Sequence, residues 1–163
     1  MKRRAGAAFS LIELLIVIAV GTLLTAMAIP LTINALRSYQ LTAAVSSATG
    51  AIQSTRYQAI MHGYPYEITF TPATKSFQVF SMIPPGTTYS AMVSAGSTTL
   101  PTSPVPITGS GGISISRTVT YQFAAGGTVT ETSNNMVFSI TNEWGGSNTI
   151  TVSGVGNVSV STP

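Results

Sequence analysis

An apolar segment of 22 residues near the N-terminus constrains the fold more than any other feature of this chain. It covers residues 9–30, FSLIELLIVIAVGTLLTAMAIP, and its only charged residue is Glu13. As a helix it would measure about 33 Å, slightly more than the ~30 Å hydrocarbon core of a bilayer. A lone carboxylate inside a membrane costs about 2.5–3.5 kcal/mol at the helix centre, which makes Glu13 a candidate functional residue.

The residues before this segment indicate how it is oriented and processed. Lys2, Arg3 and Arg4 are followed by four small neutral residues, 5–8. The positive-inside rule places this basic end in the cytoplasm and the chain after Pro30 outside. A secretory signal would carry its small residues after a shorter apolar core. Here they come first, so a cut among them would remove the basic leader and leave the helix on the mature protein.

Residues 9–13, FSLIE, resemble the processing site of type IV prepilins, whose usual form is Gly followed by Phe-Thr-Leu-Ile-Glu. The resemblance implies that a membrane aspartyl peptidase, the prepilin peptidase, cuts between Ala8 and Phe9 and methylates the new amine of Phe9. It also implies that Glu13, fifth in the mature chain, is needed for assembly, and that Pro30 takes the twenty-second position, where many pilins carry proline. Ala8 departs from the preferred glycine. A cut after Gly6 would make Glu13 seventh, which favours the Ala8/Phe9 bond.

Two roles are open for Glu13. In a filament of packed helices, the amine of Phe9 on one subunit can neutralise the carboxylate of a neighbour, where unpaired charges are costly. Alternatively, the carboxylate only occupies the first helical turn, where the helix dipole favours it. The motif favours the pairing role.

The rest of the composition argues against an enzyme and against a nucleic-acid-binding protein. The formal charge of +3 comes from the leader, because four cations and four glutamates remain after it: Arg37, Arg56, Lys75, Arg117, Glu13, Glu67, Glu131 and Glu143. There is no Cys and no Asp, and His62 is the only histidine. A catalytic triad or a zinc site cannot be assembled from these residues within one subunit. We therefore expect no catalytic residues, no metal and no cofactor.

The helix is expected to continue past Pro30 to about residue 61. Pro30 predicts a kink, or alternatively a break between two helices. Beyond it, apolar or small residues recur three or four positions apart on one face: Leu41, Ala44, Val45, Ala48, Ile52, Thr55, Ala59 and Ile60. Gly63 and Pro65 predict the end of the helix.

The end of this helix carries a second, more particular resemblance. Residues 55–63, TRYQAIMHG, followed by a strand, resemble the helix end of GspH/FimT-type proteins, which are minor pseudopilins of type II secretion systems and minor pilins of type IV pili. The matching positions are Arg56, Ala59 and Gly63, while Thr55 replaces the usual alanine. Arg56 is expected to pack along the sheet and pair with a carboxylate or carbonyl rather than bind a ligand. His62 is expected to face the helix dipole rather than relay protons.

The remainder reads as a β-rich domain. Residues 66–70 and 76–80 predict a hairpin with a five-residue loop, and residues 83–112 predict a long surface loop, with a short strand near residues 89–93. That loop is either a contact surface or a passive connection. Six further strands are expected at residues 113–116, 119–123, 128–132, 136–140, 149–153 and 157–161. One sheet face would hold Ile68, Phe70, Val119, Tyr121, Phe123, Phe138, Ile140, Ile150 and Val152, with Trp144 anchoring a turn.

The last strand bears on nucleic-acid binding. In FimT-like proteins that bind DNA, the resemblance implies a Gly-Arg-x-Arg pattern here, with arginines that contact phosphates. This chain has Gly156 followed by Asn157, Val158 and Ser159. Loss of both arginines removes the electrostatic contribution to DNA binding, so nucleic acid is an unlikely partner.

Together these features predict an α+β, pilin-like fold: a long N-terminal helix, half in the membrane and half exposed, packed on a mainly antiparallel sheet. The expected divisions are a prepilin leader (1–8), a transmembrane and assembly helix (9–30), the exposed half of the helix (31–62) and a globular domain (63–163). We expect a minor pseudopilin or minor pilin in the bacterial inner membrane, with its C-terminal domain periplasmic or extracellular. Its partners would be other pilins, prepilin peptidase and the inner-membrane assembly platform. A major pilin and a DNA-uptake pilin are the alternatives.

Overall fold

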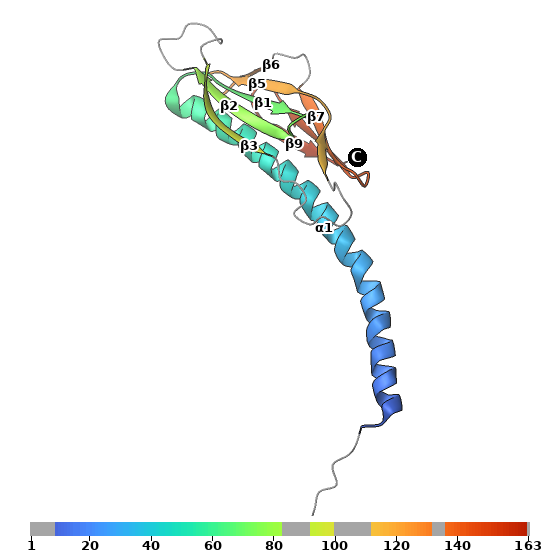
Figure 1. The fold of residues 1–163 in the computed structure, drawn as a ribbon. Helices are drawn as coiled ribbons and strands as arrows, with labels where there is room; N and C mark the ends of the chain where they lie inside the picture. The colour runs from blue at the N-terminus through green and yellow to red at the C-terminus, as the bar shows by residue number, and fades with distance from the viewer. Residues whose placement is uncertain (1–8, 83–91, 100–111, 132–135, 163) are drawn as a thin grey trace, which may run out of the picture. The chain divides into compact units, whose positions relative to one another are not determined.

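The computed structural model describes residues 9–82, 92–99, 112–131 and 136–162, and contains one long helix followed by nine strands (Figure 1). The chain divides into two compact units, Met1–Leu36 and Arg37–Pro163. Helix α1, Leu11–His62, contributes to both. The fold is α+β, as the sequence predicts.

Helix α1 is continuous through Pro30 over its 52 residues. A break between two helices at this proline is therefore wrong, while the kink remains a prediction. A proline lacks the N–H that would bond to the carbonyl four residues earlier. The side chains of Ile29 and Leu31, on either side of Pro30, are exposed.

The C-terminal end of α1 confirms the predicted glycine cap. The N–H of Gly63 donates to the carbonyl of Ala59 at 3.0 Å, and Gly63 has a φ of 70°. A left-handed conformation of this kind costs a residue without a Cβ very little. The chain then turns into the first strand.

Five strands form one antiparallel sheet in the order β3-β2-β1-β5-β6. Their bounds are β1 Tyr66–Thr71, β2 Ser76–Met82, β3 Met92–Thr99, β5 Val119–Phe123 and β6 Val129–Glu131. Strand β1 lies between β2 and β5, with Phe70 opposite both Phe77 and Val119. A β-bulge between Val79 and Phe80 interrupts the pairing of β2 with β3.

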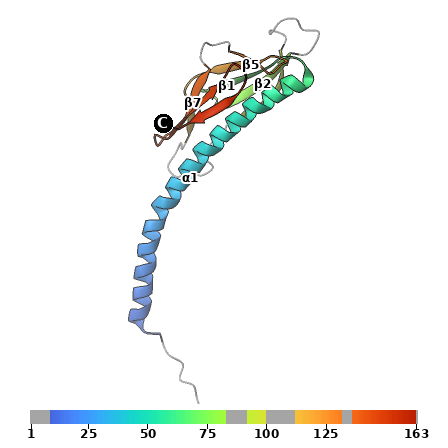
Figure 2. The same cartoon turned by 180° about the vertical axis from the view of Figure 1, so that it is seen from behind.

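Four strands form a second antiparallel sheet in the order β4-β7-β8-β9. They are β4 Ile113–Ile115, β7 Val137–Asn142, β8 Ser147–Val152 and β9 Val158–Ser161. The backbone N–H of Val129 donates to the carbonyl of Gly154 at 2.9 Å and so connects β6 to the β8–β9 turn. Figures 1 and 2 show the strands of both sheets running beside the second half of α1.

Three details of the predicted β domain need correction. The strands form two sheets, because β5 and β6 pair on the side of β1 while β4 joins β7 instead. The first hairpin has a four-residue turn, since Thr71 still pairs with Ser76. The short strand predicted near residues 89–93 of the loop at 83–112 is β3, which runs from Met92 to Thr99 and is therefore longer and later than expected, because it pairs with β2 despite its Ser- and Gly-rich composition. The rest of that loop, 83–91 and 100–111, lies outside the described residues.

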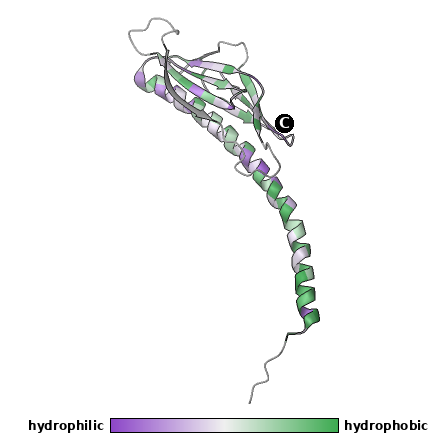
Figure 3. Ribbon diagram, viewed as in Figure 1, coloured by the Kyte–Doolittle hydropathy of each residue, from purple (hydrophilic) through white to green (hydrophobic). Residues whose placement is uncertain are grey.

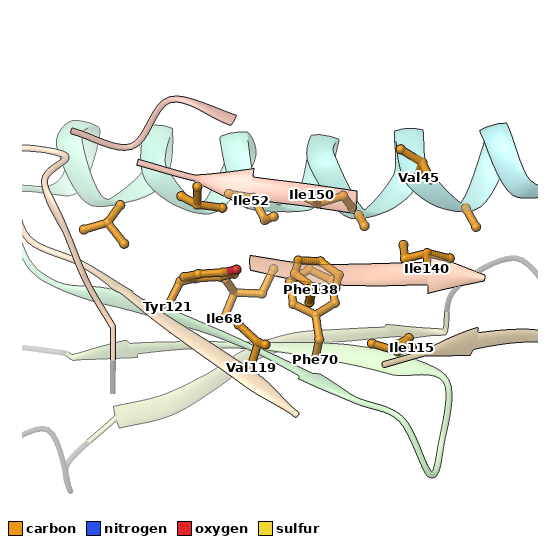
Figure 4. Close-up of a cluster of buried hydrophobic side chains, with 14 of the residues drawn as sticks. Val45, Ile52, Ile68, Phe70, Ile115, Val119, Tyr121, Phe138, Ile140 and Ile150 are labelled. Carbon is orange, nitrogen blue, oxygen red and sulfur yellow. The ribbon is translucent and has the colours of Figure 1, made fainter. Parts of the chain in front are cut away.

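One hydrophobic core joins the helix to both sheets (Figure 4). All nine core residues expected from the strands are buried, and seven of the eight expected from the helix are buried as well. Ile60 is the exception at 47% exposed, so its assignment to the buried face is wrong. Figure 4 shows Phe70 and Phe138 facing each other, with ring centroids 4.9 Å apart. This core fixes the second half of α1 against the β domain.

Candidate functional site

The first unit of the chain presents apolar side chains in every direction. Its large apolar residues from Phe9 to Leu31 are between 51% and 79% exposed, and Figure 3 shows this part of α1 coloured hydrophobic almost throughout. The helix is long and apolar enough to cross a membrane. A helix that is hydrophobic all round is stable only when lipid or other protein surrounds it. This surface is therefore the first candidate site.

Glu13 lies in the first turn of α1, where it is exposed. Ser10 precedes the helix, and its carbonyl accepts from the N–H groups of Glu13 at 3.1 Å and Leu14 at 3.2 Å. The carboxylate is thus close to the free N–H groups of the helix start, which carry partial positive charge. This position suits both of the roles open for Glu13. Ala8, the residue before the expected cut, lies outside the described residues, whereas Phe9 is described and 74% exposed.

In the second unit, Arg56 connects α1 to two distant turns. Its Nε donates to the carbonyl of Gly127 at 3.1 Å, and its Nη1 donates to the carbonyl of Gly156 at 3.4 Å. These acceptors lie 71 and 100 residues further along the chain. Arg56 is half-buried, so its guanidinium satisfies carbonyls that would otherwise lose contact with water. The predicted pairing of Arg56 with a carbonyl is confirmed, whereas packing of its stem along the sheet stays a prediction.

The two glycines whose carbonyls accept hydrogen bonds from Arg56 have little room for a side chain. Gly156 has a φ of 81°, and a Cβ there would lie 2.6 Å from Nε of Arg56 and 2.8 Å from the carbonyl oxygen of Gly127. Gly127 has a φ of 76°, and its Cβ would lie 2.7 Å from Cδ1 of Ile60. Arg56 and Gly156, both selected from the family resemblance, are thus in direct contact. We call Arg56, Gly127 and Gly156 the arginine lock.

Ala59 and Thr55 belong to the buried stripe of α1. Ala59 is fully buried and supplies the carbonyl that caps Gly63. Thr55 is also buried, and its hydroxyl donates to the carbonyl of Ala51 at 2.7 Å. The hydroxyl is therefore satisfied within the helix, which explains how a threonine fits where the resembling proteins carry alanine.

Aromatic side chains gather at the C-terminal end of α1. The ring of His62 lies 5.6 Å from that of Tyr64 and 5.7 Å from that of Tyr66. Nδ1 of His62 is 2.9 Å from the carbonyl of Gln58, and because a carbonyl only accepts, Nδ1 carries the hydrogen. His62 thus binds one of the last carbonyls of the helix, as expected. Burial, together with a hydrogen bond to Tyr64, raises the pKa of Tyr66 to about 12.

A contact between Arg37 and Trp144 was not foreseen from the sequence. The guanidinium carbon of Arg37 lies 4.4 Å from the centre of the Trp144 ring, in the turn between β7 and β8. This is a cation–π contact. Trp144 does occupy a turn, as predicted, but a sequence contains no signal for a pair separated by more than a hundred residues. Among the described residues, no cluster of His, Cys, Asp or Glu could hold a metal ion.

The comparisons with known proteins concern the N-terminal segment and the fold. The prokaryotic N-terminal methylation motif matches residues 3–29. Two crystal forms of the type IV minor pilin FimU from Pseudomonas aeruginosa resemble the fold, with TM-scores of 0.52 and 0.50 and 13% sequence identity in each. The similarity covers 77% and 76% of this chain and 94% and 97% of theirs. No curated protein matches the sequence.

The motif covers the apolar start of the chain, and the fold similarity covers most of its length. At 13% identity the second finding establishes the architecture only. Both findings agree with the exposed apolar helix and with the long-helix, antiparallel-sheet fold. The chain therefore combines an N-terminal methylation motif with a fold similar to that of a type IV minor pilin.

Proposed function

We propose that this chain is a structural subunit of a filament, a minor pseudopilin or minor pilin of the GspH/FimT type. Prepilin peptidase would cut it between Ala8 and Phe9 and methylate Phe9. The mature subunit would then pack helix against helix into a type II secretion pseudopilus, supporting protein secretion, or into a type IV pilus. The observation that carries this proposal is the coincidence of the methylation motif, residues 3–29, with an apolar helix that the described chain leaves uncovered.

The energetics of the apolar helix require a partner at each stage. More than a dozen large apolar side chains are over half exposed, and each contributes about 1.5–3 kcal/mol when it leaves water. Lipid supplies that environment before assembly, and neighbouring helices supply it afterwards. The subunit would therefore reside in the bacterial inner membrane, with residues 63–163 on the periplasmic or extracellular side, until an inner-membrane assembly platform transfers it to the filament.

Glu13 would set the axial position at which a new subunit helix packs against its neighbours in the filament. In lipid or between helices, an unpaired carboxylate is costly, whereas the methylated amine of Phe9 on a neighbouring subunit keeps its positive charge and can neutralise it. Pairing at the first turn fixes each new helix against one already in the filament. Pro30 would assist packing by freeing one backbone carbonyl and loosening the helix locally.

Analysis of the mature N-terminus tests the processing step. Mass spectrometry of the protein purified from its host membrane should give a chain that begins with N-methylated Phe9. The variant Ala8→Gly should be cut at least as fast, because it restores the residue that the family prefers. Gly6→Ala is the matched control and should leave the cut unchanged. A mature chain that retains residues 1–8 would contradict the proposal.

Incorporation into filaments tests the role of Glu13. Glu13→Gln keeps the shape but removes the charge, and we expect at least about ten-fold less subunit in sheared or purified filaments, given the 3–5 kcal/mol for breaking a buried pair. Glu143→Gln is the matched control, since it removes an exposed carboxylate from the second unit and should incorporate normally. Equal incorporation of both variants would leave Glu13 with only the helix-dipole role.

The alternatives predict different behaviour. A major pilin would dominate the mass of sheared filaments, whereas a minor subunit would be scarce there. A DNA-uptake pilin would retain DNA in a salt-sensitive manner. Asn157 and Ser159 are exposed beside Gly156 where arginines would be needed, and Arg56 is engaged in the arginine lock. These features favour the secretion or assembly role, and we expect the full-length protein to retain little DNA at moderate salt.

A further inference from the structure

The β7–β8 turn holds Trp144 against the first residue of the second unit. Arg37 lies at the start of that unit, and its guanidinium carbon is 4.4 Å from the centre of the Trp144 ring. The side chain of Asn142 shapes the turn, because its Oδ1 accepts from the N–H of Gly146 at 2.7 Å and from that of Trp144 at 3.3 Å. The position of Trp144 is therefore tied to the position of Arg37 on α1.

Arg37 is the first charged residue after Glu13. The 23 residues between them, 14–36, carry no charge, and as a continuous helix they measure about 34 Å against a hydrocarbon core of ~30 Å. Centring this uncharged stretch on the bilayer would put Glu13 close to one membrane surface and Arg37 in the headgroup layer at the other.

Two aromatic side chains lie at the same level as Arg37. Tyr39 is 72% exposed and Trp144 is 39% exposed. Positions 37 and 39 are about 200° apart around a helix, so Tyr39 and the Trp144 contact lie on opposite sides of α1. Tyrosine and tryptophan are enriched at membrane surfaces, where an apolar ring meets lipid and a polar group meets water.

We propose that Trp144, Tyr39 and Arg37 form a contact with the phospholipid headgroups of the outer leaflet while the subunit waits in the membrane before assembly. This inference rests on the proposed membrane-inserted state and adds a lipid-binding surface on the globular unit itself. Glu143, exposed and adjacent to Trp144 in the sequence, carries a charge opposite to that of Arg37. The contact therefore depends on the interfacial position of the rings and not on attraction to anionic lipid.

The chain contains a single tryptophan, so its fluorescence reports this contact directly. The full-length mature protein would be reconstituted into vesicles of phosphatidylcholine and phosphatidylglycerol. Spin-labelled lipids would then be compared, one labelled at the headgroup and one deep in the acyl chain. We expect the headgroup label to quench Trp144 more strongly. Iodide should quench it about three-fold less than a site in bulk water, because a surface potential near −30 mV excludes the anion to that extent.

The matched control moves the tryptophan to the far end of the second unit. In the variant Trp144→Phe with Tyr57→Trp, the new indole takes a position that is 62% exposed. It lies about 30 Å along the helix from Arg37, well beyond the Debye length of ~8 Å. Iodide should quench this tryptophan fully, and neither spin label should affect it.

The outcomes separate this contact from the proposed function. If the protein does not float with the vesicles, the proposed membrane-inserted state is wrong, and the proposed headgroup contact is wrong as well. If it floats, but Trp144 is as accessible to iodide as the control tryptophan, the contact alone is overturned. Lipid quenching of both tryptophans would mean that the unit lies flat on the bilayer, which also overturns it. Protection that rises with the protein-to-lipid ratio would identify a second copy of the chain as the occupant instead.

Discussion

Helix α1 meets its surroundings differently in the two units. Up to Leu31 it presents leucine, isoleucine and valine on all sides, and these side chains are exposed. From Leu41 to Ala59 it presents one stripe of seven buried residues, mostly small, to the two sheets. The first half thus depends on lipid or neighbouring helices, and the second half is stabilised within the chain. Continuous secondary structure therefore says little about where the stability of a helix comes from.

The sharpest test of this difference compares two large-to-small substitutions. Phe138 is 1% exposed and stacks on Phe70, so Phe138→Ala should lower the free energy of unfolding of the second unit by about 3–5 kcal/mol. Leu23→Ala removes a side chain that is 63% exposed and should change it by less than about 0.5 kcal/mol. Denaturant titration of the full chain in detergent, followed by Trp144 fluorescence, measures both. Similar losses in the two variants would mean that the units are not independent.

The arginine lock gives the next largest effect. Gly156→Ala must accept a positive φ and displace Arg56 and the carbonyl of Gly127, so we expect a loss of about 2–3 kcal/mol. Gly145→Ala is the matched control. It has a φ of 86° but open space around its Cβ, and it should cost only about 1 kcal/mol. Equal costs would show that backbone strain, and not the contact with Arg56, accounts for the glycine.

Removing the guanidinium alone should cost less. Arg56→Met keeps the apolar stem over the sheet but leaves the carbonyls of Gly127 and Gly156 without their donor. The expected loss is about 1.5–2 kcal/mol, near the low end for bonds from a charged donor, because one of the two N–O distances is 3.4 Å. Arg56→Lys should recover part of it. If Arg56→Met unfolds at the same denaturant concentration as the unaltered chain, the lock contributes nothing to stability.

Local patterns in the sequence predicted what depends on neighbouring residues. The helical stripe, the glycine cap at Gly63 and the alternating strands follow from periodicity and backbone preference, and the structure confirms them. Ile60 was misassigned because periodicity does not show where the sheets end beside the helix. Ile60 lies next to Gly127, which has no side chain to cover it, and so Ile60 remains partly exposed.

The arrangement of distant segments could not be predicted in this way. The division into two sheets depends on β5 pairing with β1 while β4 pairs with β7. The sequences of these strands do not indicate which partner each of them takes. The acceptors of Arg56 are backbone carbonyls, which every residue possesses, so the sequence does not identify them. The only indication was that both acceptors are glycines, which allow another side chain to come close to the backbone. The N-terminal methylation motif was predictable because its residues are contiguous in the sequence.

The smallest expected effect is a pH dependence of the unfolding free energy that arises from Tyr66, the first residue of β1, close to the C-terminal end of α1. Burial and the bond to Tyr64 raise the pKa of Tyr66 from 10.0 to about 12. Below pH 10 the phenol is neutral in both states, so its contribution to stability is fully present. Between pH 10 and 12 the unfolded chain loses the proton while the folded chain retains it, and stability should fall.

Unfolding free energies of Tyr66→Phe and the unaltered chain, measured at intervals across this range, should therefore converge as the pH rises, because phenylalanine has no proton to lose. Tyr57→Phe, at a position 62% exposed, is the control and should leave the slope unchanged. If the unaltered chain and Tyr66→Phe show the same slope, burial at this end of α1 is weaker than the contacts around Tyr66 indicate. The part of α1 that is stabilised by packing on the sheets would then end near Ala59, its last buried residue, and not at His62.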